Sequence, residues 1–267
     1  MFFFLPLYDD NPTSRAPVVT YLLIGTCVAV FLWQLGQNAE HVAYSYGMIP
    51  AVLFGEPHLP QSLVAVPPWA TILTSMFLHG SWLHIGGNML FLWIFGNNIE
   101  DVLGHGRYLL LYLVSGAAAA MGQALSDPSS TVPMLGASGA IAGVLGAYLL
   151  IYPKANVHVL VLIIIILRMV TVPAWIMLGL WFAVQLASGL FSSSATGGVA
   201  FWAHVAGFTT GIVLLLVMRP AGLALLQPPR TAQFVAAPPR QFLGRRTFHG
   251  SVPDSGAVRF RRRGPWD

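Results

Sequence analysis

Six stretches of the chain are apolar over the length that a membrane-spanning helix requires. Such a helix needs about 20 mostly apolar residues, with a range of roughly 17–25. The stretches run over residues 17–36, 82–100, 107–125, 134–152, 171–191 and 200–218, and glycines and polar residues interrupt the second and third of them. The pattern predicts an all-α fold, a polytopic membrane protein with six transmembrane helices.

Two further apolar segments are not expected to span the membrane. Residues 157–167 form a short run between Lys154 and Arg168. Spanning would place these two charges on opposite sides with too little helix between them, so an interfacial or buried loop segment is expected. The loop after the first stretch, about residues 37–81, is long, apolar and without a basic residue. We expect this loop to lie partly in the outer leaflet, packed on protein.

The composition requires a lipid environment. The chain is 56% hydrophobic and only 8% charged, with a mean hydropathy of +0.70, whereas a soluble domain carries about 25% charged residues. The single cysteine, Cys27, lies in the first apolar stretch and allows no internal disulfide. Residues 1–6 lack a basic segment, so no cleavable signal peptide is expected.

The placement of positive charge predicts the orientation in the membrane. All thirteen Lys and Arg residues lie in the N-terminal arm, at Arg107, in the connector Lys154–Arg168, or in the tail from Arg219 onward. With six spans these groups alternate with uncharged loops, so both termini are predicted to be cytoplasmic. The predicted division is an arm over residues 1–16, a membrane domain over 17–219 and a tail over 220–267.

The tail is rich in proline and arginine, with four arginines among residues 259–263. This composition predicts a disordered segment. A basic segment next to a membrane is attracted to anionic lipid, and nucleic acid is the less favoured partner.

Four polar residues inside the apolar stretches are candidates for function, because polar groups are costly there. They are His84, Asn88, Ser138 and His204. Counted from the charged residue that ends each stretch, they lie about 24, 18, 24 and 22 Å above the inner boundary at 1.5 Å per residue. In a hydrocarbon core about 30 Å thick, the four therefore share one level.

These residue types fit one kind of chemistry. A serine hydroxyl becomes a nucleophile when a base takes its proton, and histidine is the usual base near neutral pH. Small residues follow both Ser138 and His204 and allow their helices to approach closely. Asn88 and His84 lie four residues apart, on one helix face, as candidate donors to an oxyanion. No Asp or Glu lies at that level, so the pair would be a Ser–His dyad without an acid.

Other interpretations of the same residues stay open. Gly136–Ala140 is typical of helix packing, Asn88 of an interhelical hydrogen bond, and a single intramembrane histidine of a structural role. His79, His84 and His204 suggest zinc, but no thiolate or carboxylate joins them, so a metal site is not favoured. A transporter or channel is a further alternative, although the chain shows no pair of broken spans that would indicate an inverted repeat.

The chain resembles the rhomboid intramembrane serine proteases. The resemblance rests on His79–Asn88, on Gly136–Ala140, and on Ala203–Phe208 with Gly211, which occur in the family's order and with family-like spacing. It covers about residues 17–219.

This resemblance implies a six-helix core whose fourth helix starts below the outer surface, at the floor of a water-accessible cavity. It also implies that Ser138 is the nucleophile and His204 the base, with Asn88, His84 and the backbone N–H of Ser138 holding the oxyanion. The substrates would be transmembrane protein segments that enter near the fifth helix and loop 192–199. No metal or cofactor is expected, and the oligomeric state is left open.

Three further expectations follow from the resemblance. A bacterial inner membrane is the expected location. A non-catalytic relative that binds transmembrane helices is the alternative function. The family often places an aromatic residue four positions after the serine, where this chain has Ala142. The ring of His204 is therefore held less firmly or by another side chain.

Overall fold

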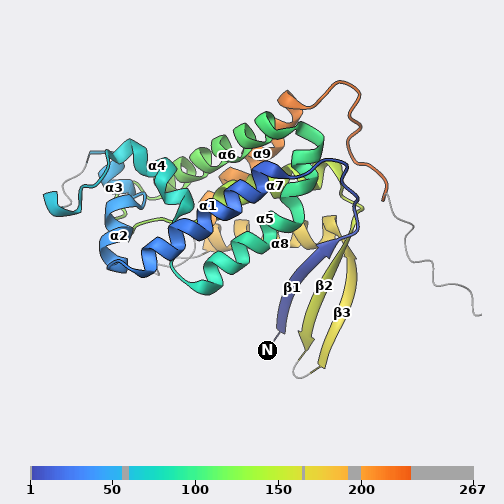
Figure 1. Cartoon of the computed structure of the whole chain (residues 1–267), viewed down its shortest axis with the longest axis horizontal. Helices are drawn as coiled ribbons and strands as arrows, with labels where there is room; N and C mark the ends of the chain where they lie inside the picture. The colour runs from blue at the N-terminus through green and yellow to red at the C-terminus, as the bar shows by residue number, and fades with distance from the viewer. Residues whose placement is uncertain (1, 56–59, 164–165, 192–199, 230–267) are drawn as a thin grey trace, which may run out of the picture. The chain divides into compact units, whose positions relative to one another are not determined.

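The computed structural model describes residues 2–55, 60–163, 166–191 and 200–229 (Figure 1). Its longer helices are α1 (Val18–Leu35), α5 (Trp82–Leu103), α6 (His105–Ser126), α7 (Ser138–Ile151), α8 (Ala174–Phe191) and α9 (Phe201–Met218). Short helices between α1 and α5 are α2 (Ala39–Tyr46), α3 (Pro50–Leu53) and α4 (Thr71–Thr74), with 3-10 turns at Gln61–Leu63, Pro68–Ala70 and Ser75–Phe77. The strands are β1 (Phe2–Asp9), β2 (Asn156–Ile163) and β3 (Ile166–Pro173).

The six predicted apolar stretches correspond to the six longer helices. Within the described residues, four of them are long and apolar enough to cross a membrane, namely α1, α6, α8 and α9. In α5, polar residues such as Asn88 and Asn98 interrupt the apolar sequence. Helix α7 has 14 residues and is about 21 Å long, less than the thickness of the hydrocarbon core. The chain is therefore a polytopic membrane protein, while six separate spans stay a prediction.

A three-stranded antiparallel sheet corrects the all-α prediction (Figure 1). The described strands lie in the order β1-β2-β3, with Leu5 opposite Leu160 and Val159 opposite Val170. The run 157–167, expected to be an interfacial or loop segment, forms most of β2 and the start of β3, apart from residues 164–165 outside the described ranges. Val157, Val159 and Val161 of β2 are buried, because strand side chains alternate between faces and these three point toward the core.

Helix α7 forms the centre of the helix packing. It packs against α9, α6 and α5, and nearly all of its residues are buried. Its small residues make this possible. A Cβ added at Gly207 would overlap the carbonyl oxygen of Gly139, and one at Gly211 would overlap that of Gly143. The backbones of α7 and α9 are thus in direct contact, as the small residues after Ser138 and His204 predict.

Two acidic side chains, Glu100 and Asp101, fix the start of α1 to the end of α5. The Glu100 carboxylate is fully buried and accepts hydrogen bonds from the backbone N–H groups of Val19 and Thr20, at 2.7 and 2.8 Å. These are free N–H groups of the first turn of α1, where a negative charge is also favoured by the helix dipole. Asp101 accepts from the backbone N–H of Arg15 at 2.8 Å.

Strand β1 is also joined to the helices through Asp9. Its Oδ2 accepts from the Tyr148 hydroxyl at 2.5 Å and from Asn98 Nδ2 at 2.9 Å. Burial raises the pKa of Asp9 to about 7. The predicted arm, residues 1–16, therefore contains a strand held by α5 and α7, and the division at residues 17 and 220 stays a prediction. Residues 230–267 of the predicted tail lie outside the described ranges.

These contacts gather the start of α1, the end of α5 and the end of α7 at one end of the bundle. The segment after α9 joins them, because the backbone N–H of Leu226 donates to the carbonyl of Leu150 at 3.0 Å. This agrees with the alternation that the charge pattern predicts, and the orientation in a membrane stays a prediction.

The long loop between α1 and α5 packs on protein, as predicted. Met48 is fully buried and forms an antiparallel bridge with Met134, just before α7. Nearby, the backbone N–H of Gly136 donates to the carbonyl of Ser75 at 2.8 Å. Other apolar side chains of the loop, including Trp69, are exposed. The loop therefore fixes the segment that leads into α7.

Candidate active site

Ser138 is the first residue of α7. The first N–H groups of a helix have no partner within the helix, and the first backbone bond of α7 runs from the N–H of Ile141 to the carbonyl of Ala137. The turn before the helix needs a glycine, because Gly136 has φ +126° and a Cβ there would lie 2.7 Å from the imidazole Nε2 of His84. Ser138 thus begins a helix, and its backbone N–H is one of those that have no partner within the helix.

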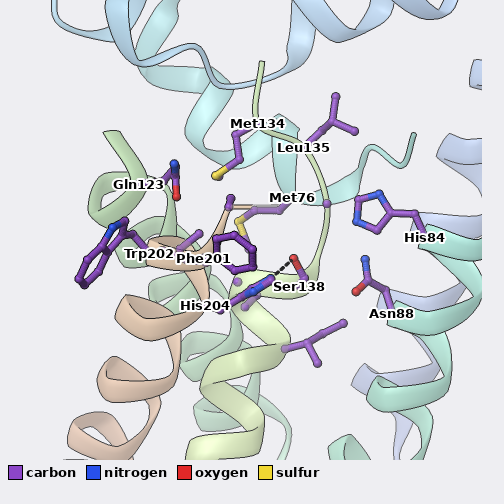
Figure 2. A pocket seen from close by; sticks show the side chains of 18 of the residues that line it. Met76, His84, Asn88, Gln123, Met134, Leu135, Ser138, Phe201, Trp202 and His204 are labelled. Atoms are coloured by element: carbon purple, nitrogen blue, oxygen red, sulfur yellow. Dashed lines mark hydrogen bonds between the residues drawn. The ribbon is translucent and has the colours of Figure 1, made fainter. Parts of the chain in front are cut away.

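His204 of α9 contacts Ser138 directly. Its Nε2 lies 2.8 Å from the serine Oγ, within hydrogen-bond distance (Figure 2). The two residues are 66 positions apart in the sequence. The approach depends on the contact between α7 and α9 one turn away, where Gly207 lies against the backbone of Gly139. The structure therefore brings together the two residues that the sequence predicts as nucleophile and base.

Two side chains of α8 contact the imidazole of His204 away from Ser138. The Nδ1 atom lies 2.8 Å from Gln185 Oε1, and the Trp181 ring lies 5.5 Å from the imidazole, centroid to centroid. Sequence reasoning missed both residues, since it treated 171–191 only as an apolar span. A polar residue inside that span was the available signal. From the sequence, Ala142 stands where an aromatic residue would support the ring of His204, and no replacement for it was identified. In the structure, α8 provides contacts to the ring.

His84 and Asn88 project from α5 on the opposite side of Ser138 (Figure 2). Both face Gly136, because a Cβ there would lie 2.7 Å from His84 Nε2 and 3.7 Å from Asn88 Nδ2. The backbone N–H of Gly80 donates to His84 Nδ1 at 3.4 Å, so Nδ1 is an acceptor and the hydrogen of the neutral ring lies on Nε2. The Nδ2 of Asn88 is buried and has no hydrogen-bond partner among the described residues.

The four predicted residues line one cavity of about 780 Å³. Its wall also includes Met76, Gln123, Met134, Phe201 and Trp202 (Figure 2). This volume is within the usual range for ligand pockets, roughly 300–1,000 Å³. Of the predicted entry region, Trp181 and Gly189 of α8 reach the cavity wall, while loop 192–199 lies outside the described residues. The site combines a serine, a histidine and two further donors around one space.

The described part of the chain has no group of three or more His, Cys, Asp or Glu side chains placed to hold a metal ion. His79 is buried and packs its ring 5.2 Å from that of His84. The expectation of a site without metal or cofactor stays a prediction.

A Ser–His pair in contact within a bundle of apolar helices defines the class, an integral membrane protein with a polar site among its helices. The chain belongs to the rhomboid family, because the family model of the Rhomboid domain matches residues 67–221, more than half of its length. The matched region contains all four predicted site residues.

Individual relatives agree with this assignment. The chain is 34% identical over 134 residues to Rhomboid protease GluP of Bacillus subtilis, covering 50% of this chain and 24% of that protein. It is 30% identical over 204 residues to Rhomboid protein 1, mitochondrial, of Saccharomyces cerevisiae, covering 73% of this chain and 51% of that protein. Rhomboid-like protein 11, chloroplastic, of Arabidopsis thaliana is 29% identical to the chain over 157 residues, covering 57% of this chain and 53% of that protein. The chain thus spans between a quarter and about half of these relatives.

Proposed function

We propose that the chain is an intramembrane serine endopeptidase that hydrolyses peptide bonds in or near transmembrane segments of membrane proteins. The observation that carries the proposal is the 2.8 Å contact between Ser138 Oγ and His204 Nε2 at the wall of the cavity. A nucleophile and a base within hydrogen-bond reach are the minimum that acyl transfer by a serine requires. The names of relatives such as Rhomboid protease GluP support the same reaction class.

The first step is attack by Ser138. His204 Nε2 takes the hydroxyl proton as Oγ bonds to the substrate carbonyl carbon, and the carbonyl oxygen becomes negatively charged. The peptide C–N bond then breaks as His204 returns the proton to the leaving nitrogen. This leaves the amine product and an ester between Ser138 and the remaining acyl group. Water activated by His204 hydrolyses the ester and restores the serine.

The oxyanion is assigned to three donors. They are the backbone N–H of Ser138, the Nε2–H of His84 and the Nδ2–H of Asn88. Two features of the site support this assignment, namely the tautomer of His84 and the free amide of Asn88. Donors held in place before the reaction stabilise the charge that develops in the transition state, and removal of one donor costs about 10²–10³ in kcat.

Substrate class and location complete the proposal. Transmembrane segments of other proteins are the substrates, since the site is formed within apolar helices and lipid is the surrounding solvent. An extended segment is required, because the backbone groups of an intact helix are bonded to each other. By resemblance to the family we propose a bacterial inner membrane as the location, and from the distribution of Lys and Arg we propose that both termini are cytoplasmic. Relatives are also named mitochondrial and chloroplastic. Expression in a bacterial host with topology reporters at both termini tests the proposed orientation.

The decisive experiment compares Ser138→Ala with the wild type on a transmembrane reporter in liposomes. Cleavage should fall by more than about 10³-fold, as it does when a serine nucleophile is removed. Ser45→Ala is the control for removal of a serine hydroxyl, because Ser45 is a buried serine that lies on α2, outside the cavity wall. Unchanged cleavage by a folded Ser138→Ala protein would refute the proposal. Reporter binding without cleavage by the wild type would favour a non-catalytic binder of transmembrane helices.

A further inference from the structure

Gln185 is a buried polar residue on a helix that is otherwise apolar toward the core. Within α8, whose residues are all described, the buried positions are Ala174, Leu178 and Gln185. A buried amide in an apolar environment is unfavourable unless its hydrogen bonds are made. The Gln185 side chain makes one with His204, at 2.8 Å between Oε1 and Nδ1.

This contact bears on which nitrogen of His204 carries the hydrogen. The amide oxygen of Gln185 accepts hydrogen bonds and does not donate them, so it favours the tautomer with hydrogen on Nδ1. In that tautomer the lone pair lies on Nε2, the atom 2.8 Å from Ser138 Oγ. In the other tautomer Nε2 would carry the hydrogen and could not accept the serine proton. The lone pair of Nδ1 would then face a lone pair of the Gln185 Oε1 atom, which is unfavourable.

We propose that Gln185 is a positioning residue that holds His204 in the tautomer and ring orientation that accept the Ser138 proton. The inference rests on the proposed function and adds to it a third residue, which acts through the base. Serine hydrolases with a triad use a carboxylate at the corresponding nitrogen. Here a neutral amide takes that place.

The geometry around the ring supports a positioning role. Trp181 lies one helical turn before Gln185, and its ring centroid is 5.5 Å from that of His204. Helix α8 thus provides both a hydrogen bond and an aromatic contact to the same imidazole. On the side of α7, the residue one turn after Ser138 is Ala142, which has only a methyl group. Orientation of the ring therefore depends on α8.

The test measures the reactivity of Ser138 separately from the binding of a transmembrane substrate. The full chain is purified in detergent, and the rate constant for labelling of Ser138 by a small fluorophosphonate is determined for the wild type, Gln185→Met and Gln185→Glu. Met has a similar shape but lacks the amide oxygen, whereas Glu keeps an oxygen that can accept from Nδ1–H. Val184→Ala is the matched control, because Val184 is the neighbouring residue on α8 and is 51% exposed.

We expect Gln185→Met to lower the labelling rate constant about tenfold, as for the loss of one neutral hydrogen bond. On a transmembrane reporter, kcat should fall by the same factor while KM changes less than about twofold, because the bond acts on the base and not on substrate binding. Gln185→Glu should restore labelling to within a few fold of the wild type. Val184→Ala should label at the wild-type rate.

The outcomes separate this inference from the proposed function. Wild-type labelling of Ser138 together with an unchanged rate in Gln185→Met would overturn the positioning role and leave the peptidase proposal intact. Equal loss in the Met and Glu variants, with lowered thermal stability in both, would show a purely structural role. Absence of labelling in the wild type would overturn the peptidase proposal itself. If Gln185→Met does not fold, Gln185→Asn replaces it, since the shorter amide falls out of reach of Nδ1 and should label as slowly.

Discussion

The contact between α7 and α9 predicts a severe effect of one added methyl group at Gly207. This residue lies three positions after His204, and its Cα faces the carbonyl of Gly139, the residue after Ser138. A Cβ at Gly207 would lie well inside contact distance of that oxygen, and close to the Ala119 methyl at 3.4 Å. Because the obstacle is backbone on a fully packed helix, no side chain can turn aside to relieve the overlap.

The size of the effect follows from the distances. Carbon and oxygen in contact are normally about 3.3–3.6 Å apart, so α9 must move away from α7 by about 1 Å in Gly207→Ala. The distance from Ser138 Oγ to His204 Nε2, now 2.8 Å, would then exceed the hydrogen-bond limit of about 3.2 Å. A misplacement of about 1 Å costs on the order of 10²-fold in rate, equivalent to about 2.7 kcal/mol of transition-state stabilisation. Overpacking should also destabilise the fold by about 1–3 kcal/mol.

The assay is cleavage of a transmembrane reporter, with fluorophosphonate labelling of Ser138 and thermal unfolding in detergent measured on the same preparations. Gly25→Ala is the matched control, because Gly25 lies in the interior of α1 and a Cβ there meets no atom within 4 Å. It should keep wild-type cleavage and should be stabilised slightly, since alanine is the better helix former. Wild-type labelling by Gly207→Ala would refute the reasoning that the close approach of the two helices holds Ser138 and His204 together.

Three further changes test other parts of the structure. Gly136→Ala should lower stability and cleavage, because φ is +126° there and the new Cβ would collide with His84; a normal melting temperature would contradict this. Asn88→Ala should lower kcat by about 10²–10³ with little change in KM, as measured by steady-state kinetics on the reporter. A kcat close to the wild-type value would show that Asn88 only packs. Asp9→Asn should remove a pH dependence of stability. Burial raises the pKa of Asp9 to about 7, so the protonated carboxyl stabilises the fold. This contribution to the free energy of unfolding is complete below about pH 4, is lost as the pH rises through 7, and amounts to at most about 4 kcal/mol. Melting curves at pH 5 and 8 should therefore differ more for the wild type than for the variant.

The contact between Ser138 and His204 was predictable because its determinants are local. A polar residue in an apolar stretch is visible in the sequence, and the rise of a helix converts its position into a depth. Small residues beside Ser138 and His204 indicated that their helices meet. None of this required knowledge of how distant segments fold. The placement of His84 and Asn88 facing Gly136 follows in the same way, since both lie on one face of α5.

The sheet and Gln185 were not predicted, for different physical reasons. Strand β1 has no partner near it in the sequence, and its pairing with β2 joins residues such as Leu5 and Leu160, which no local pattern reveals. The short apolar run 157–167 fits a buried strand and an interfacial segment equally well by hydropathy alone. Gln185 was visible as a polar residue in a span, but its partner depends on the rotation of α8 about its axis, which the sequence does not specify.

The placement of Ser138 within the bundle depends on protein contacts at both ends of α7. At about 21 Å, this helix is too short to be positioned by the two membrane surfaces, as a full span would be. Its start is held by the bond from Gly136 to Ser75 and by the bridge of Met134 to Met48. Its end is held by the bond from Tyr148 to Asp9, on a strand that sequence reasoning left out of the fold. The sheet is therefore part of what sets the position of the serine, because it fixes the far end of the helix that begins with it.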